Sequence, residues 1–213
     1  MRSRLAEHIV GVLRYKADRS SVSLLERHSP REWKQVLPWL DASGLALYFL
    51  HRIETLGATA ALPPATLARL HQNLADNRER TANLLAEMCA IHQGFDAAGV
   101  EFAVLKGYSL VPDYCPAAPL RHQCDLDYLV APPHLHRVFA VLCDLGYARV
   151  RTSSGSYTFA RSTGEMPSRN HIYNPGVNYS IELHTALWEN HEVATFEPLP
   201  GVLARRRLHW ACG

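Results

Sequence analysis

The chain has 213 residues, enough for one large domain or for a smaller domain with a helical attachment, and either would bury a core. With 22 Lys and Arg against 20 Asp and Glu, the net charge is +2, which gives no case for a nucleic-acid or membrane partner. Charges interrupt every long apolar run, including those of the N-terminal segment. We therefore expect no membrane span, no signal peptide and a cytoplasmic location.

The first 98 residues are predicted to form a helical bundle. Upstream of the main helix, residues 31–57 predict at least two shorter helices, broken near Pro38 and near Ser43 and Gly44. One long helix is then expected, with Pro63 and Pro64 near its start and Gly99 just past its end. Its apolar face recurs at three- and four-residue steps: Leu67, Leu70, Leu74, Thr81, Leu84, Met88, Ile91 and Phe95.

After Gly99 the pattern changes to short apolar or alternating runs separated by Gly, Pro, Ser and Asn. The runs predict strands over 100–105, 125–130, 147–152, 156–161 and 177–187, and a helix over 132–146. The fold class is therefore α+β, with a helical region over 1–98 followed by an α/β domain over 99–213.

Two carboxylates stand one residue apart in the predicted strand 125–130. Because side chains alternate along a strand, Asp125 and Asp127 share one face, with Cα atoms roughly 6.5 to 7 Å apart. In the strand 177–187, Glu182 and His184 also share one face. If the two strands are neighbours, Glu182 completes a cluster of three carboxylates. The simpler alternative is a solvated polar face, the usual fate of an alternating strand.

A cluster of three carboxylates suits magnesium, which is bound by oxygen atoms and bridges to substrate phosphates. Two such ions about 3.5 to 4 Å apart can activate an attacking oxygen and stabilise a leaving one in phosphoryl or nucleotidyl transfer. His184 can orient Glu182 or touch the acceptor, although a histidine on a partly polar strand is more often a structural hydrogen-bonding group. Lys106, at a strand end, can pair with either aspartate or with phosphate.

The ordered motifs "VLKGYSL", "LRHQCDLDYLV" and "YSIELHTALWE" resemble the uncharacterised nucleotidyltransferase family of the DNA polymerase beta nucleotidyltransferase superfamily. The resemblance covers roughly residues 99–190 and implies a mixed sheet with helices on one face. It implies a magnesium-dependent enzyme that moves a nucleoside monophosphate from a nucleoside triphosphate, ATP among the candidates, to a hydroxyl of an unknown small molecule or protein.

The resemblance also assigns roles to residues of this chain. It implies that Asp125 and Asp127 hold a divalent metal with the triphosphate, and that Glu182 binds the second metal and acts on the acceptor hydroxyl. Lys106 and Gly107 correspond to the turn that cradles phosphate, with Ser109 as the nearest serine. Arg121 corresponds to a basic position that contacts phosphate.

Two departures from the superfamily support an alternative function. Gly107 is followed by Tyr108 where active members carry a second small residue, and few residues follow the last predicted strand. The alternative is a catalytically degenerate protein of the same fold that binds a ligand or a partner as an accessory factor. Either the N-terminal helices enclose the site, or a partner protein or a second copy of the chain does so.

Overall fold

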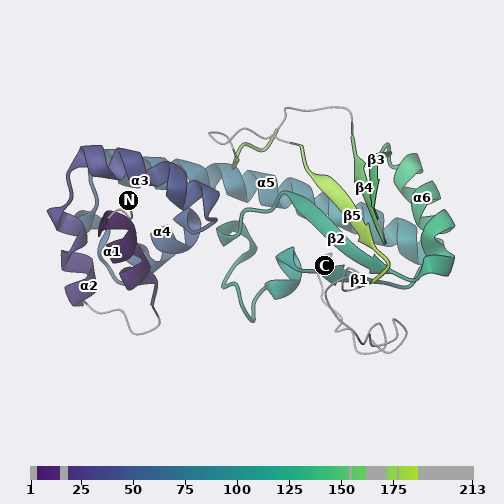
Figure 1. The fold of residues 1–213 in the computed structure, drawn as a ribbon, viewed down its shortest axis with the longest axis horizontal. Coiled ribbons are helices and arrows are strands. Elements are labelled where there is room, and N and C mark those ends of the chain that lie inside the picture. The colour runs from purple at the N-terminus through teal and green to yellow at the C-terminus, as the bar shows by residue number, and fades with distance from the viewer. Residues whose placement is uncertain (1–3, 15–18, 154, 162–171, 177, 187–213) are drawn as a thin grey trace. The chain divides into compact units, whose positions relative to one another are not determined.

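The computed structural model describes residues 4–14, 19–153, 155–161, 172–176 and 178–186 (Figure 1). Its α-helices are α1 (Arg4–Leu13), α2 (Arg19–Ser23), α3 (Pro30–Ala42), α4 (Ala46–Thr55), α5 (Pro64–Ala97) and α6 (Leu135–Asp144). Its strands are β1 (Phe102–Leu105), β2 (Asp125–Val130), β3 (Ala148–Ser153), β4 (Ser156–Ala160) and β5 (Ser180–His184). This order of helices followed by a sheet confirms the α+β class.

The described chain forms two compact units, and α5 contributes residues to both. The first unit contains the described residues up to Thr81, together with 115–122 and 172–175. The second contains Ala82–Tyr114 and the described residues of 123–166 and 176–186. Within the described ranges, no helix combines the length and the hydropathy that a membrane span requires.

The predicted helix break near Pro38 is wrong, because α3 continues through this proline to Ala42. Proline in a helix removes the hydrogen bond to the carbonyl four residues earlier, which here belongs to Lys34. Both residues are exposed, so water can reach the carbonyl that loses its partner. Buried Trp33 and Leu37 on the opposite face fix the helix in place. The predicted break at Ser43 and Gly44 is confirmed.

The long predicted helix is confirmed as α5, which begins at Pro64 and ends at Ala97. Its predicted apolar face is buried from Leu70 onward. Gly99 follows the helix with φ of 62°, a left-handed conformation that glycine adopts without steric cost. This turn lets the amide of Val100 donate to the carbonyl of Phe95 at 2.9 Å, which satisfies a carbonyl of the last helical turn.

Buried polar side chains of α5 hold two later segments within the first unit. Asn77, 1% exposed, donates to the carbonyl of Pro119 at 2.8 Å. Arg80, 2% exposed, donates to the carbonyl of Asn174 at 3.3 Å. Segments 115–122 and 172–175 are therefore fastened to the helical unit by side chains that give up hydration to do so.

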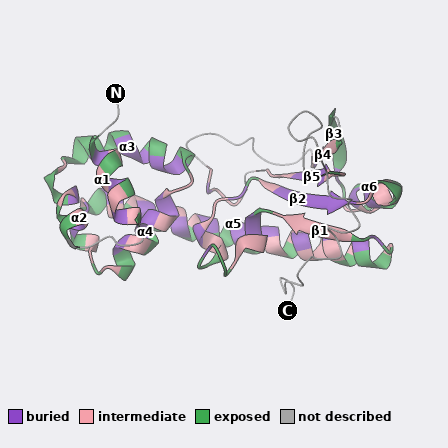
Figure 2. Ribbon diagram, turned by 60° about the horizontal axis from the view of Figure 1, so that its bottom comes forward, coloured by how far each residue is buried: buried purple, intermediate pink, exposed green. Residues whose placement is uncertain are grey.

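The sheet has the strand order β1-β2-β5-β4-β3. β2 and β5 are parallel, and every other neighbouring pair is antiparallel. The segment between β2 and β5, which contains α6, β3 and β4, makes the crossover that a parallel pair needs. Figure 2 shows that the interior strand β2 is buried along most of its length, whereas every residue of the edge strand β3 is exposed.

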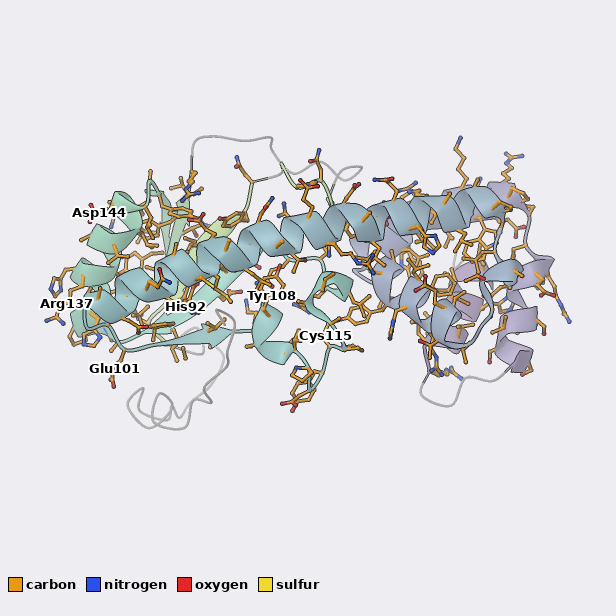
Figure 3. All side chains as sticks on the ribbon, turned by 180° about the vertical axis from the view of Figure 1, so that it is seen from behind. His92, Glu101, Tyr108, Cys115, Arg137 and Asp144 are labelled. Atoms are coloured by element: carbon orange, nitrogen blue, oxygen red, sulfur yellow. The ribbon has the colours of Figure 1, made fainter. Side chains whose placement is uncertain are left out.

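Both helices of the second unit pack on the same face of the sheet. Phe95 and His92 of α5 contact the ring of Tyr128 on β2, with ring centroids 5.5 and 5.6 Å apart (Figure 3 shows His92 on α5). Phe139 of α6 contacts Phe159 of β4 at 5.2 Å. Because alternate residues of a strand point to opposite faces, the acidic positions of β2 lie on the face away from these helices.

Candidate active site

β2 presents its two carboxylates on the face opposite α5 and α6. Leu126 and Tyr128 are buried against the helices, which fixes the register of the strand. The same alternation directs Asp125 and Asp127 to the other face. Asp127 is 1% exposed, so this face is not simply a solvated one.

β5 brings Glu182 and His184 to the same face. The parallel register pairs Asp127 with Glu182 and Leu129 with His184. His184 Nε2 lies 3.1 Å from Asp127 Oδ1 and 3.8 Å from Glu182 Oε2. Ligand atoms of Asp127, Glu182 and His184 all lie within 4.8 Å of one another, a spacing at which they can hold one metal ion.

Lys106 enters the site from the turn after β1. Its Nζ donates to Asp127 Oδ1 at 2.9 Å. Its backbone has φ of 55° and ψ of −157°, a combination that residues with a side chain rarely adopt. Ser109 fastens the turn, because its hydroxyl donates to the carbonyl of Lys106 at 2.6 Å. In this arrangement the Ser109 proton is engaged with the backbone.

Gly107 allows the turn to pass close to β2. A Cβ atom at this position would lie 2.2 Å from the Nε2 of Gln123, nearer than atoms approach in real structures. Gln123 is buried and donates from Nε2 to the carbonyl of Asp125 at 2.6 Å. Gln123 thus links the Gly107 turn to the start of β2. Sequence reasoning missed Gln123, because nothing in its local pattern marks it as a contact of residue 107.

The basic groups around Asp127 determine its charge state. Burial alone would raise the pKa of Asp127, but hydrogen bonds from His184 and Lys106 lower it below the ordinary value. The hydrogen bond to Asp127 raises the pKa of Lys106, with further contributions from the charges of Asp125 and Glu182. Asp127 is therefore a carboxylate at neutral pH, and Lys106 is an ammonium within the field of three acids.

Arg121 belongs to the first unit, and the remaining predicted site residues belong to the second. The carbonyl of Arg121 accepts a hydrogen bond from Asn77 at 3.3 Å. Burial and Cys115 raise the pKa of Tyr48 to about 12, while a hydrogen bond and the positive charge of Arg121 act in the opposite direction. A phosphate contact from Arg121 stays a prediction.

The donor set fits a hard divalent cation. The side chains of Asp127 and Glu182 supply carboxylate oxygens, which magnesium prefers, and Asp125 adds a third acid to the electrostatic field at Lys106. Imidazole nitrogen is not a usual magnesium ligand, so His184 is better suited to orient Asp127 through their hydrogen bond. Tyr108 is buried, so its ring offers no open stacking surface.

Comparisons with known proteins agree with these motifs. A model of the uncharacterised nucleotidyltransferase family matches residues 29–212. Searches of the curated proteins and of the solved structures returned no match. The matched segment covers most of the helical region as well as the sheet. The chain therefore belongs to the uncharacterised nucleotidyltransferase family, and its general chemistry is that of a nucleotidyltransferase.

Proposed function

We propose that the protein is a magnesium-dependent enzyme that transfers a nucleoside monophosphate from a nucleoside triphosphate to a hydroxyl of a small molecule or a protein. The observation that carries this proposal is the register of β2 and β5, which pairs Asp127 with Glu182 on the face opposite the helices. Membership of the family supports the reaction class.

In this proposal the acceptor oxygen attacks the α-phosphorus, the bond from that phosphorus to the bridging oxygen breaks, and pyrophosphate leaves. Asp125, Asp127 and Glu182 would hold the divalent metal, and Glu182, 32% exposed, would also accept the proton of the acceptor hydroxyl. Bound magnesium supplies charge neutralisation at the triphosphate. Lys106 and the Gly107 turn position the phosphates, Ser109 holds the turn through its hydrogen bond to the Lys106 carbonyl, and His184 orients Asp127.

A second candidate function is a catalytically degenerate accessory protein of the same fold. One observation favours it: Lys106 forms an ion pair with Asp127, and His184 forms a hydrogen bond with the same carboxylate oxygen. The presence of a buried carboxylate at Asp127 is therefore explained by this ion pair as well as by catalysis. A protein of this kind would bind a ligand or a partner and would respond weakly to magnesium and nucleotide.

A thermal-shift panel of ATP, CTP, GTP and UTP, with and without magnesium, separates the two functions. A nucleotide present at 100 times its Kd should stabilise the fold by about 2.7 kcal/mol, which raises the melting temperature by about 5 to 10 °C in a chain of this size. We expect one nucleotide to do so only with magnesium. A flat response across the panel would favour the accessory protein.

Asp127→Asn is expected to abolish both this stabilisation and the transfer of α-labelled nucleotide to acceptors in a cell extract. The substitution removes the charge that holds metal while keeping the shape of the side chain. Asp144→Asn, the same change at an exposed residue of α6, serves as the control and should behave like the wild type. Circular dichroism verifies that both variants fold. Transfer by Asp127→Asn at near wild-type rates would contradict the assignment.

A further inference from the structure

Lys106 occupies the position of a cation within the carboxylate cluster. Its Nζ lies 2.9 Å from Asp127 Oδ1, and the charges of Asp125 and Glu182 also act on it. Opposing acids on neighbouring strands repel each other unless a positive charge lies among them. In the structure described here, that positive charge belongs to the protein itself.

The ammonium and a divalent cation compete for the same carboxylate. Asp127 is 1% exposed and its Oδ1 already accepts hydrogen bonds from Lys106 and His184. A divalent ion bound by Asp127 and Glu182 would lie beside the ammonium, and the two positive charges would repel each other. Binding of the ion therefore requires Lys106 to leave.

The side chain of Lys106 can move away from Asp127. Its side chain is 60% exposed, whereas its partner Asp127 is buried, so only the lysine can swing away without exposing the core. The turn that carries it is held by Ser109 and lies against Gln123, which leaves the backbone in place while the side chain moves. A flexible four-carbon stem with a compact charge is suited to such an exchange.

We propose that Lys106 is an exchangeable counter-ion, which neutralises Asp127 in the metal-free protein and passes to the triphosphate when the divalent cation binds. This inference rests on the proposed function. Its consequence is positive cooperativity: the free cation binds weakly because it must displace Lys106, and the triphosphate strengthens cation binding because it offers the displaced ammonium a new partner. The site thereby selects the cation–triphosphate complex over the free cation.

The test measures binding and needs no knowledge of the nucleotide. Free Mn²⁺ and preformed Mn²⁺–inorganic triphosphate are titrated into wild type and Lys106→Met by calorimetry. We expect Lys106→Met to bind free Mn²⁺ about tenfold more tightly, because one neighbouring positive charge is lost, and to bind the Mn²⁺–triphosphate complex more weakly. Lys34→Met, the same change at an exposed residue of α3 in the other unit, should match the wild type in both titrations.

A second variant guards against a folding artefact. Lys106→Gly removes the ammonium and also suits the φ of 55°, so it should show the same gain in Mn²⁺ affinity. If the wild type binds Mn²⁺–triphosphate but both Lys106 variants bind free Mn²⁺ no more tightly than the wild type does, the proposed role of Lys106 is wrong and the proposed function stands. If the wild type and Asp127→Asn bind neither probe, both the proposed function and the proposed role of Lys106 are wrong.

Discussion

The turn at Lys106 and Gly107 shows how single residues shape the candidate site. Both residues have positive φ values, 55° and 53°, and only one of them is glycine. Strain of this kind costs on the order of 1 to 3 kcal/mol and persists only where the surroundings enforce it. Here the surroundings are the ion pair of Lys106 with Asp127 and the close approach of Gln123 to Gly107.

Gly107→Ala is expected to destabilise the protein by about 2 to 4 kcal/mol, because strain at positive φ adds to a clash with Gln123. Gly57→Ala is a matched control: its φ is 63°, but a Cβ there meets no atom within 4 Å. Urea unfolding of both variants separates the clash from the strain. Equal destabilisation at the two positions would show that Gln123 yields easily.

The site residues differ in how far the sequence could reveal them. Alternation along one strand was enough to place Asp125 and Asp127 on a common face. Glu182 needed one further assumption, the pairing of two strands, which the register of β2 and β5 bears out. The contacts of Lys106 with Asp127 and of Gln123 with Gly107 join residues 21 and 16 positions apart through side-chain packing. No local period encodes such contacts.

At the scale of elements, α3 begins with two reciprocal hydrogen bonds. The amide of Glu32 donates to Ser29 Oγ at 3.4 Å, and the amide of Ser29 donates to Glu32 Oε2 at 2.8 Å. His28 adds a hydrogen bond to Glu32 Oε1 at 2.9 Å. The hydrogen bond from His28, followed by those from the amide and the hydroxyl of Ser29, lowers the pKa of Glu32 from 4.5 to about 2.

This pKa predicts how acid affects α3. The folded pKa is below the unfolded one, so the carboxylate of Glu32 stabilises the fold fully above pH 4.5, and the contribution disappears as pH falls toward 2. Glu32→Gln should therefore flatten the decline of the unfolding free energy in this range. Equilibrium unfolding at several pH values measures it, with Glu26→Gln as the exposed control in the preceding turn. Parallel curves for Glu32→Gln and wild type would contradict the prediction.

Helices and strands were predictable where one face is consistently apolar, as in α5 and β2. The helix break predicted at Pro38 was wrong because tertiary packing stabilises α3 by more than the loss of one hydrogen bond destabilises it. Four apolar residues of this helix are buried: Trp33, Val36, Leu37 and Leu40. The local sequence contains the signal for a break, whereas the packing that overrides it depends on the rest of the unit.

At the scale of the whole molecule, chain segments distant in sequence share one unit. His122, from segment 115–122, contacts the ring of Tyr173 with centroids 5.5 Å apart. Burial, which is the largest cause, and the positive charges of Arg80 and Arg121 together lower the pKa of His122 from 6.5 to about 4. The folded protein thus holds this imidazole neutral.

The neutral His122 predicts a loss of stability under mild acid. Between pH 6.5 and 4 the unfolded chain takes up a proton at this residue that the folded chain refuses, so the unfolding free energy should decrease as pH falls through this range. His122→Gln should remove part of that decrease. His51→Gln, at an exposed position of α4 in the same unit, is the control. Identical pH dependence in all three proteins would contradict the prediction.

The division of α5 between two units affects which truncated fragments of the protein can fold. A fragment that starts at residue 99, where the sequence pattern changes, would discard Ile91 and Phe95, which are fully buried, and leave the ring of Tyr128 without its helix. The bare apolar face of the sheet would then invite aggregation during expression. A fragment that starts at Ala82 retains this cover but separates segments 115–122 and 172–175 from Asn77 and Arg80, so a cut at the first strand is the more damaging of the two.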